Sequence, residues 1–503
     1  MAVLYGLLVL GAVTTVFPFL TMLTTGFKGP TDQNDNRLIP AFFSEIDTKG
    51  TDGKPDPSSL SWKYLNDKYT ADLSQIGSTR IGAGASSDEL QKYERFLMSL
   101  PNDSWSAGFR TPANQVTSRL TQRWQAWLRD RFDSIQEVNE AYIEENVAFQ
   151  TAVPPTELLE RTFWVPPPGK KYQDWLEFKR TLPAEFRIPI RAQRMYQEFL
   201  RSKFQNQFGA VPKDVIGDAK SFEELALVDG ALRDEFLAKG LPERFQAKTA
   251  EQLWSEVSEG PMPIAAYEQQ FIDRNQSAIK REFAGRNYRY VLDFILLNGR
   301  SLWNTAIFCL LVILTQLIVN PLAAYALSRY PIRASGKILL FLLATMAFPA
   351  EVAMIPSFLL LKDLGLLNTF AALVLPGMAS GYMIFLLKGF FDSLPQELFE
   401  AGQLDGAKES TMMMRIAMPL SKPVLGYLAL LAFMGAYGAF LYAFLVCQDQ
   451  KMWTIMVWIY QLQNTAPKSV MMAALTLAAV PTLVVFLLAQ RVIMRGIVLP
   501  GER

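Results

Sequence analysis

Long apolar runs near both ends of the chain, separated by a polar middle, most constrain how this sequence can fold. The first run covers residues 1–27 and ends at Lys28. Five more runs of comparable length follow the polar middle, at residues 302–328, 338–361, 369–391, 424–446 and 470–493. At about 1.5 Å per residue in a helix, each can cross the roughly 30 Å hydrocarbon core of a bilayer. The sequence therefore predicts an all-α membrane protein with six transmembrane helices.

The first apolar run has a second interpretation, as a cleaved signal peptide. The run is long, no Lys or Arg precedes it, and no small-residue cleavage pattern follows it. We therefore interpret residues 1–28 as the first transmembrane helix. The missing basic residues leave open whether Met1 is the true start of the chain.

The polar middle, residues 29–293, has the composition of a water-exposed domain and is rich in Trp, Tyr, Arg, Glu and Asp. Both cysteines, Cys309 and Cys447, lie outside it, so it must fold without disulfides or thiolate-bound zinc. The whole chain lacks histidine, which removes the commonest general base and metal ligand. The net charge of +1 gives no basic footprint for a nucleic acid. We expect an insertion domain at 29–293 and a membrane core at 294–503.

Basic residues in the short connections predict the orientation of the chain. Three connections carry most of them: Arg329, Arg333 and Lys337; Lys388, Lys408, Arg415 and Lys422; and, at the C-terminus, Arg491, Arg495 and Arg503. Cytoplasmic loops of membrane proteins carry an excess of Lys and Arg. The C-terminus is therefore predicted to be cytoplasmic, and the insertion 29–293 extracytoplasmic.

Charged residues are scarce within the apolar runs, and Glu351, between Pro349 and Pro356, is the main exception. Prolines break the helical hydrogen-bond ladder, so we interpret Glu351 as a partner for freed backbone groups or water rather than as a proton relay. A secondary transporter is disfavoured, because it would place charges at the membrane midplane and repeat its membrane half.

The connection at residues 392–423 has the pattern of two short helices joined by a turn. Pro395 suits the start of a helix, and Gly406 permits the left-handed conformation that ends one. A second helix can run from Ala407 to Ile416, before Pro419. Apolar residues between the charges, among them Leu398, Phe399 and Met413, give a surface that fits a groove on a partner protein.

This connection resembles the cytoplasmic signature of ABC-importer permeases, which reads E-A-A, three residues, G, nine residues, I-x-L-P. The matching positions are Glu400, Ala401, Gly406, Ile416 and Pro419. Asp405 lies directly before Gly406. Gly402 replaces the third residue of E-A-A and Met418 replaces Leu. The resemblance implies the type I ABC-importer permease fold, with Glu400, Ala401, Gly402, Asp405, Gly406, Ile416 and Pro419 in a loop that docks on an ATPase.

The resemblance extends over residues 1–28 and 290–503 and is similar to the sugar-permease branch, the smaller permease subunit of maltose-type importers. The segments that carry it are 324–329, 349–356, 364–369, 385–391, 490–491 and 495–496. Tyr437-Gly438 stands where these permeases commonly have Trp-Asn. The resemblance implies a non-catalytic subunit of the bacterial inner membrane that binds no cofactor. Its implied partners are an ABC ATPase dimer that uses ATP, a second permease subunit, an extracytoplasmic solute-binding protein and membrane lipid.

The alternative function is a membrane-anchored extracytoplasmic domain that binds or processes carbohydrate. It would explain the aromatic insertion but leaves the loop from Glu400 to Pro419 without a purpose. The sequence names no substrate-binding residue.

The insertion is predicted to be mainly α-helical and to contain an internal duplication, about residues 93–140 and 175–215. Trp124-Gln-x-Trp-Leu-Arg-x-Arg-Phe132 has the same spacing as Tyr196-Gln-x-Phe-Leu-Arg-x-Lys-Phe204. Similarity by chance between two amphipathic helices is the alternative. At helical spacing the aromatic residues are expected in a core rather than stacked on sugars. Trp164, before three prolines, is expected either in an exposed rigid loop or in a linker.

Overall fold

The computed structural model describes residues 1–45, 56, 58–70, 85–110, 119–146, 149–246, 248–293, 300–345, 349–464 and 466–494. Arg495 and Arg503, used above for the orientation, lie outside the described residues. The chain divides into two compact units. Unit 1 comprises residues 1–290 and 466–470, and unit 2 comprises residues 291–465 and 471–503. The predicted domain boundaries, 28/29 and 293/294, remain predictions.

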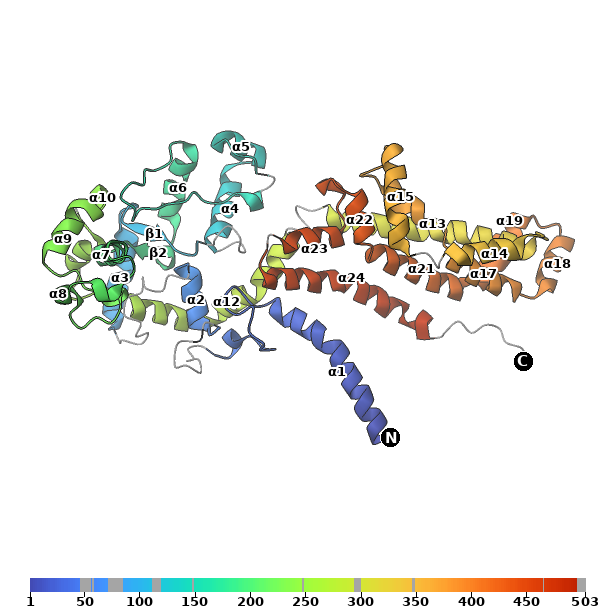
Figure 1. Cartoon of the computed structure of the whole chain (residues 1–503), viewed down its shortest axis with the longest axis horizontal. Coiled ribbons are helices and arrows are strands. Elements are labelled where there is room, and N and C mark those ends of the chain that lie inside the picture. The colour runs from blue at the N-terminus through green and yellow to red at the C-terminus, as the bar shows by residue number, and fades with distance from the viewer. Residues whose placement is uncertain are drawn as a thin grey trace. The chain divides into compact units, whose positions relative to one another are not determined.

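Unit 1 is mostly helical, as Figure 1 shows. Its helices are α1 (Ala2–Thr25), α2 (Leu60–Lys68), α3 (Ser87–Ser99), α4 (Arg119–Arg131), α5 (Ile135–Tyr142), α6 (Lys170–Thr181), α7 (Ala192–Lys203), α8 (Lys213–Ile216), α9 (Ala231–Glu235), α10 (Glu243–Gln246), α11 (Ala250–Ser255) and α12 (Ile264–Leu292). Its two strands are β1 (Trp105–Ala107) and β2 (Arg187–Pro189).

The two blocks of similar sequence share one order of elements, helix, strand, helix. The first block holds α3, β1 and α4, and the second holds α6, β2 and α7. The strands pair antiparallel, with Trp105 opposite Pro189 and Ala107 opposite Arg187. Trp124 and Tyr196, which begin the matching sequence patterns, are both fully buried. The shared order agrees with a duplication, which stays a prediction.

Aromatic side chains fill the core of unit 1. Trp105, Trp124 and Trp175 are fully buried in one cluster, and the Trp124 ring lies edge-on to Trp175 with 5.9 Å between centroids. Tyr196 and Phe236 are fully buried in a second cluster. The expectation that aromatic residues at helical spacing form a core is confirmed for Trp124 and Tyr196. A large aromatic area removed from water stabilises a fold of such short helices.

The end of α1 is fixed to the end of α12. The Asn287 side chain is buried and donates hydrogen bonds to the carbonyls of Gly26, at 2.9 Å, and Lys28, at 2.6 Å. The Tyr288 hydroxyl donates to the carbonyl of Leu23 at 2.9 Å. These bonds satisfy carbonyls that a helix end leaves without partners. The insertion therefore begins and ends at one place, beside the last turn of α1.

Unit 2 consists of helices. They are α13 (Ser301–Arg329), α14 (Ser335–Thr345), α15 (Ala350–Asp363), α16 (Phe370–Val374), α17 (Gly381–Asp392), α18 (Gln396–Leu404), α19 (Glu409–Met412), α20 (Met418–Leu420), α21 (Lys422–Tyr437), α22 (Leu441–Val446), α23 (Ile455–Gln463) and α24 (Lys468–Met494), whose first residues belong to unit 1. Helix α13 packs along α17 and α21.

Three described helices are long and apolar enough to cross a membrane, α1, α13 and α24. Two bent pairs raise this number to five: residues 370–377 with α17, and residues 409–420 with α21. The predicted run 338–361 contains two helices, because Pro349 precedes α15 and its ring cannot continue a helical ladder. The run 424–446 is also divided, at Gly438. The total of six spans remains a prediction.

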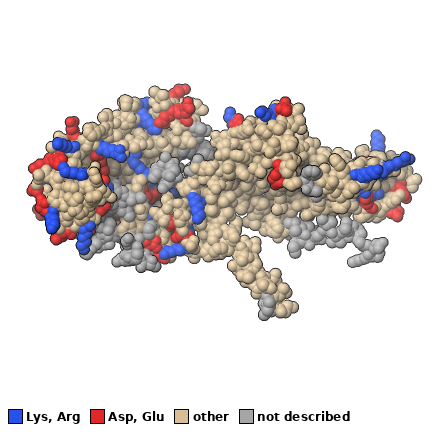
Figure 2. Space-filling view, viewed as in Figure 1, with Lys and Arg blue, Asp and Glu red and all other residues tan. Residues whose placement is uncertain are grey.

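The surface of unit 2 has the polarity expected of a protein in lipid. Figure 2 shows an uncharged surface over its long helices, with charged side chains gathered around α18 and α19 and beside α15 and α22. Large apolar residues face outward, among them Leu310, Ile318 and Phe341. Small residues such as Ala324 and Ala473 are fully buried, which allows close packing of helices within a bilayer.

Candidate functional site

The coupling loop, residues 392–423, contains three short helices and one turn. Helix α18 follows Pro395, and α19 continues through a π-helical segment, Met413–Ala417, into α20. The chain then bends by 81° into α21. The expected helix-turn-helix is therefore present, although its second helix begins at Glu409 rather than at Ala407 and ends at Leu420, one residue after Pro419.

The turn depends on Gly406. Its φ of +73° lies in the left-handed region that favours glycine. The Gly406 amide donates to the carbonyl of Gln403 at 3.0 Å, and the Ala407 amide donates to the carbonyl of Gly402 at 2.9 Å. These two bonds form a Schellman motif, which ends a helix with a left-handed glycine and satisfies its last carbonyls. The structure thus gives a physical reason for glycine at this point of the signature.

The other predicted site residues lie around this turn without meeting at one point. Glu400, Ala401, Asp405 and Pro419 are exposed, and Glu400 accepts a hydrogen bond from Gln396 at 2.8 Å. Gly402 faces the second helix, where an added Cβ would lie 3.4 Å from Ile416 Cδ1 and 3.5 Å from Met412 Sδ. The two helices of the loop therefore contact each other at Gly402 and Ile416.

The apolar side chains of the loop point in two directions. Phe399, Met412, Met413 and Ala417 are buried within unit 2. Leu404, beside the turn, is 90% exposed, and Leu398 and Met414 are also exposed. Exposed apolar residues on a charged, water-facing loop are typical of a protein-binding surface.

The end of α13 holds both helices of the loop. The Tyr325 hydroxyl donates to Glu409 Oε2 at 3.1 Å, and the Ser328 hydroxyl donates to Asp392 Oδ1 at 2.6 Å. The Arg329 guanidinium lies 3.7 Å from the centroid of the Phe399 ring and donates to the carbonyls at Phe391 and Leu394. These contacts fix both helices of the loop to the end of α13.

Sequence reasoning used these α13 residues only for the orientation, through Arg329, and as part of the segment 324–329 that carries the resemblance. A signal was present, because Tyr325, Ser328 and Arg329 are spaced three and four apart and so share one face of a helix. The partners of that face are separated from it by roughly 60 residues or more, and nothing in the sequence indicates them.

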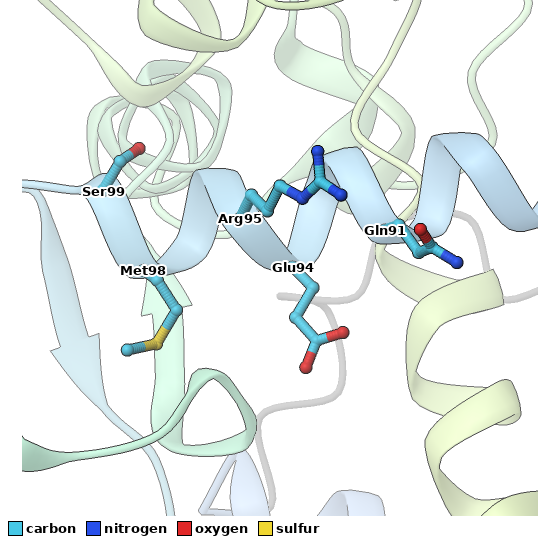
Figure 3. Close-up of a pocket in the computed structure, with 5 residues that line it drawn as sticks. All are labelled: Gln91, Glu94, Arg95, Met98 and Ser99. Atoms are coloured by element: carbon cyan, nitrogen blue, oxygen red, sulfur yellow. The ribbon is translucent and has the colours of Figure 1, made fainter.

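The described residues show no cluster of metal-binding side chains. They contain no group of three or more Cys, Asp or Glu residues able to hold a metal ion. A hollow on the exposed side of α3 is lined by Gln91, Glu94, Arg95, Met98 and Ser99. All five come from one helix, and Glu94 and Met98 point away from Arg95 and Ser99 (Figure 3).

Several helices long and apolar enough to span a membrane are the feature of a multispanning membrane protein. The chain belongs to the family of inner membrane components of binding-protein-dependent transport systems, and that family matches residues 319–498. It is 32% identical over 205 residues to the sn-glycerol-3-phosphate transport system permease protein UgpE of Brucella abortus (strain 2308), covering 40% of this chain and 72% of that protein.

Further comparisons match a similar share of the chain. The UgpE protein of Yersinia pestis bv. Antiqua (strain Antiqua) is 35% identical over 206 residues, covering 40% of this chain and 73% of that protein. A bacterial ABC transporter involved in the import of the acidic polysaccharide alginate has a chain with a TM-score of 0.36 and 24% identity. That match covers 41% of this chain and 78% of the other.

Proposed function

We propose that this chain is the permease subunit of an ATP-driven importer and forms part of the path by which a sugar or oligosaccharide crosses the cytoplasmic membrane. Membership of the transport family supports the permease role. Relatives named for sn-glycerol-3-phosphate, a phosphorylated polyol, support a polyhydroxylated substrate. The chain itself hydrolyses no ATP in this proposal, since partner ATPase subunits do so.

The coupling loop is the proposed dock for the ATPase dimer. The observation that carries this assignment is the turn at Gly406, which presents the exposed Leu404 on a loop held by α13. A partner groove would bury Leu404, and closure of the ATPase would move α13 through Tyr325 and Arg329. Glu400, Ala401, Gly402, Asp405, Ile416 and Pro419 form the remainder of this dock.

The dock is tested with matched substitutions at Gly406. Valine is disfavoured in a left-handed conformation, whereas asparagine tolerates it. We expect Gly406→Val to reduce substrate-stimulated ATP hydrolysis by about tenfold or more and Gly406→Asn to retain most of it, since a β-branched residue costs roughly 1–2 kcal/mol there. The full chain would be reconstituted in liposomes with the ATPase and second permease encoded beside it. Equal activity of wild type and Gly406→Val, with assembly intact, would refute the dock.

The insertion is proposed to be extracytoplasmic and to capture a solute-binding protein. The basic side chains around the coupling loop and their expected cytoplasmic side support the first part. The bonds from Asn287 and Tyr288 to the end of α1 support the second, because they hold the insertion where α1 leaves the membrane. A domain of roughly 260 residues adds contact area for that encounter.

Cysteine labelling tests this topology directly. The native Cys309 and Cys447 are buried and can be replaced by alanine to remove background. Cysteines would then be introduced singly at two exposed residues, Val228 in the insertion and Leu404 in the coupling loop. A membrane-impermeant maleimide added to intact cells should label Val228→Cys alone. Labelling of Leu404→Cys alone would reverse the orientation.

A further inference from the structure

A groove in the insertion lies between segments that are distant in the sequence. Its volume is about 940 Å³. We call it the insertion groove. Its lining residues come from the turn after α3, the loop before α6, α6 itself and α10. Those used below are Asn102, Asp103, Phe163, Trp164, Tyr172, Arg180, Glu243 and Arg244. This volume lies at the upper end of the range for sites that enclose small organic ligands.

The aromatic side chains of the groove are more exposed than those at the centre of the core. Trp124 and Trp175 are fully buried, but Trp164 is only half-buried and Phe163 is 96% exposed. The fold therefore gains little from Phe163. Trp164 packs partly against the second core cluster, so Phe163 and the exposed part of Trp164 are the apolar surfaces open to a ligand.

The loop that carries Trp164 is held in place. The Arg244 guanidinium lies 5.3 Å from the Trp164 ring centroid and donates to the Trp164 carbonyl at 2.7 Å. The Tyr172 ring lies 6.0 Å from Trp164 at an angle of 63°. These contacts order the aromatic wall before any ligand arrives, which reduces the entropy lost on binding.

Polar groups stand on the other sides of the groove. The exposed Arg180 and Glu243 side chains have no hydrogen-bond or ion-pair partner within the described part of the chain. The Asn102 amide donates to the carbonyl of Leu176 at 3.1 Å, which fixes its orientation. Guanidinium donors, a carboxylate acceptor and an oriented carboxamide are thus gathered beside the aromatic wall.

We propose that the insertion groove binds a neutral oligosaccharide. Pyranose rings have apolar C–H faces that pack on aromatic rings, and their hydroxyl groups pair with the arginine, carboxylate and carboxamide groups. The lining holds two arginines, Arg180 and Arg244, and two acidic residues, Asp103 and Glu243, so its charges balance and favour a neutral ligand. This assignment rests on the proposed function only in requiring the groove to face the outside.

Two exposed positions in the groove test the proposal without disturbing the fold. Phe163→Ala and Arg180→Ala would be compared with Arg95→Ala, an exposed arginine of the α3 hollow that serves as a matched control. The full chain in lipid nanodiscs, free of sugar-based detergents and without any solute-binding protein, would be titrated with maltoheptaose, cellohexaose and tetragalacturonate by calorimetry.

The expected result is that at least one neutral oligosaccharide binds and that Phe163→Ala and Arg180→Ala each weaken it by about tenfold, whereas Arg95→Ala leaves it unchanged. Absence of binding by both neutral oligosaccharides up to millimolar concentration, tighter binding of tetragalacturonate, or equal affinity in all variants would overturn the proposal. The ATPase assay at Gly406 is independent of these titrations, so failure of the importer assignment is distinguishable from failure of the groove.

Discussion

Unit 1 and unit 2 differ in whether they bury charged side chains. Among the described residues, every buried charged side chain lies in unit 1, including Lys68, Lys179 and Glu268. The buried polar residues of unit 2, such as Asn304, Asn320 and Thr305, are uncharged. A domain folded in water can carry many charges on its surface and can bury a few of them as ion pairs. A charged side chain within a bilayer is unfavourable both on the lipid-facing surface and in the interior. The buried charge of unit 1 is therefore typical of a domain folded in water, and its absence from the described part of unit 2 is typical of a domain in lipid.

The ion pair between Lys179 and Glu157 shows how unit 1 accommodates buried charge. The Lys179 ammonium lies 3.1 Å from the Glu157 carboxylate and donates to the carbonyls of Asn102, at 2.6 Å, and Trp105, at 2.7 Å. Burial lowers the pKa of Lys179 to about 8, and Glu157 partly opposes that shift. Three acceptors around one ammonium compensate for the loss of water.

The largest effect is expected from breaking this pair. We expect Lys179→Ala to lower the free energy of unfolding of the insertion by about 3–5 kcal/mol, because it breaks a buried ion pair and removes the donor to the carbonyls of Asn102 and Trp105. The buried Glu157 would keep only Arg110, at 3.3 Å, and Tyr172 as partners. Seven of the ten tryptophans lie between residues 62 and 254, so fluorescence during urea unfolding follows the insertion.

Lys388→Ala is the matched control in unit 2. It removes the partly exposed pair with Asp392, four residues away in α17, at 2.6 Å, and should cost about 0.3–0.5 kcal/mol. Equal effects of the two substitutions would show that the insertion does not depend on buried charge.

A lysine introduced into each unit tests whether its surface faces lipid or water. Leu314 is exposed near the middle of α13, and Phe163 is exposed in the insertion. Leu314→Lys should disfavour membrane insertion by about 2.5–3.5 kcal/mol, whereas Phe163→Lys should change stability by about 0.5 kcal/mol or less. The measurement is the amount of full-length chain in the membrane fraction. If both variants accumulate equally, the outer face of α13 contacts water or protein rather than lipid.

The coupling loop belongs to unit 2 but is expected to follow the rules of a water-exposed surface. Leu404→Ser removes an apolar side chain that contacts little within the chain. It should leave thermal unfolding unchanged and weaken binding of the ATPase about tenfold, as loss of a buried anchor does at an interface. The affinity would be measured by titrating the reconstituted permease with the ATPase. Unchanged affinity would place the dock elsewhere on the loop.

A small stabilising effect is expected from restoring the third alanine of the family signature. The added Cβ of Gly402→Ala would make ordinary contacts with Ile416 and Met412. Alanine also loses less backbone entropy than glycine in a helix, so α18 should gain about 0.5–1 kcal/mol. Hydrogen exchange of the α18 amides would detect this change. Faster exchange in the variant would show that the space at Gly402 is needed for movement between the two loop helices.

The sequence by itself determined the features that depend on near neighbours. The positions of α1, α13 and α24 follow from uninterrupted apolar runs, because length and hydropathy are local properties. The turn at Gly406 was also predicted, since a left-handed helix end needs glycine and involves only the residues beside it. For the same reason the amphipathic helix around Trp124 could be recognised.

Only the tertiary structure decided the features that join distant segments. Three features are of this kind. They are the pairing of β1 with β2, the contacts of Arg329 with the coupling loop, and the groove between Trp164 and Arg180. The prolines after Trp164 and the helical spacing around Trp124 distinguished these two tryptophans, but only the structure brought Trp164 together with Asn102 and Glu243. The physical reason is that the burial and ion pairing of a side chain depend on which other segments pack around it. Those neighbours are determined by the packing of the whole unit.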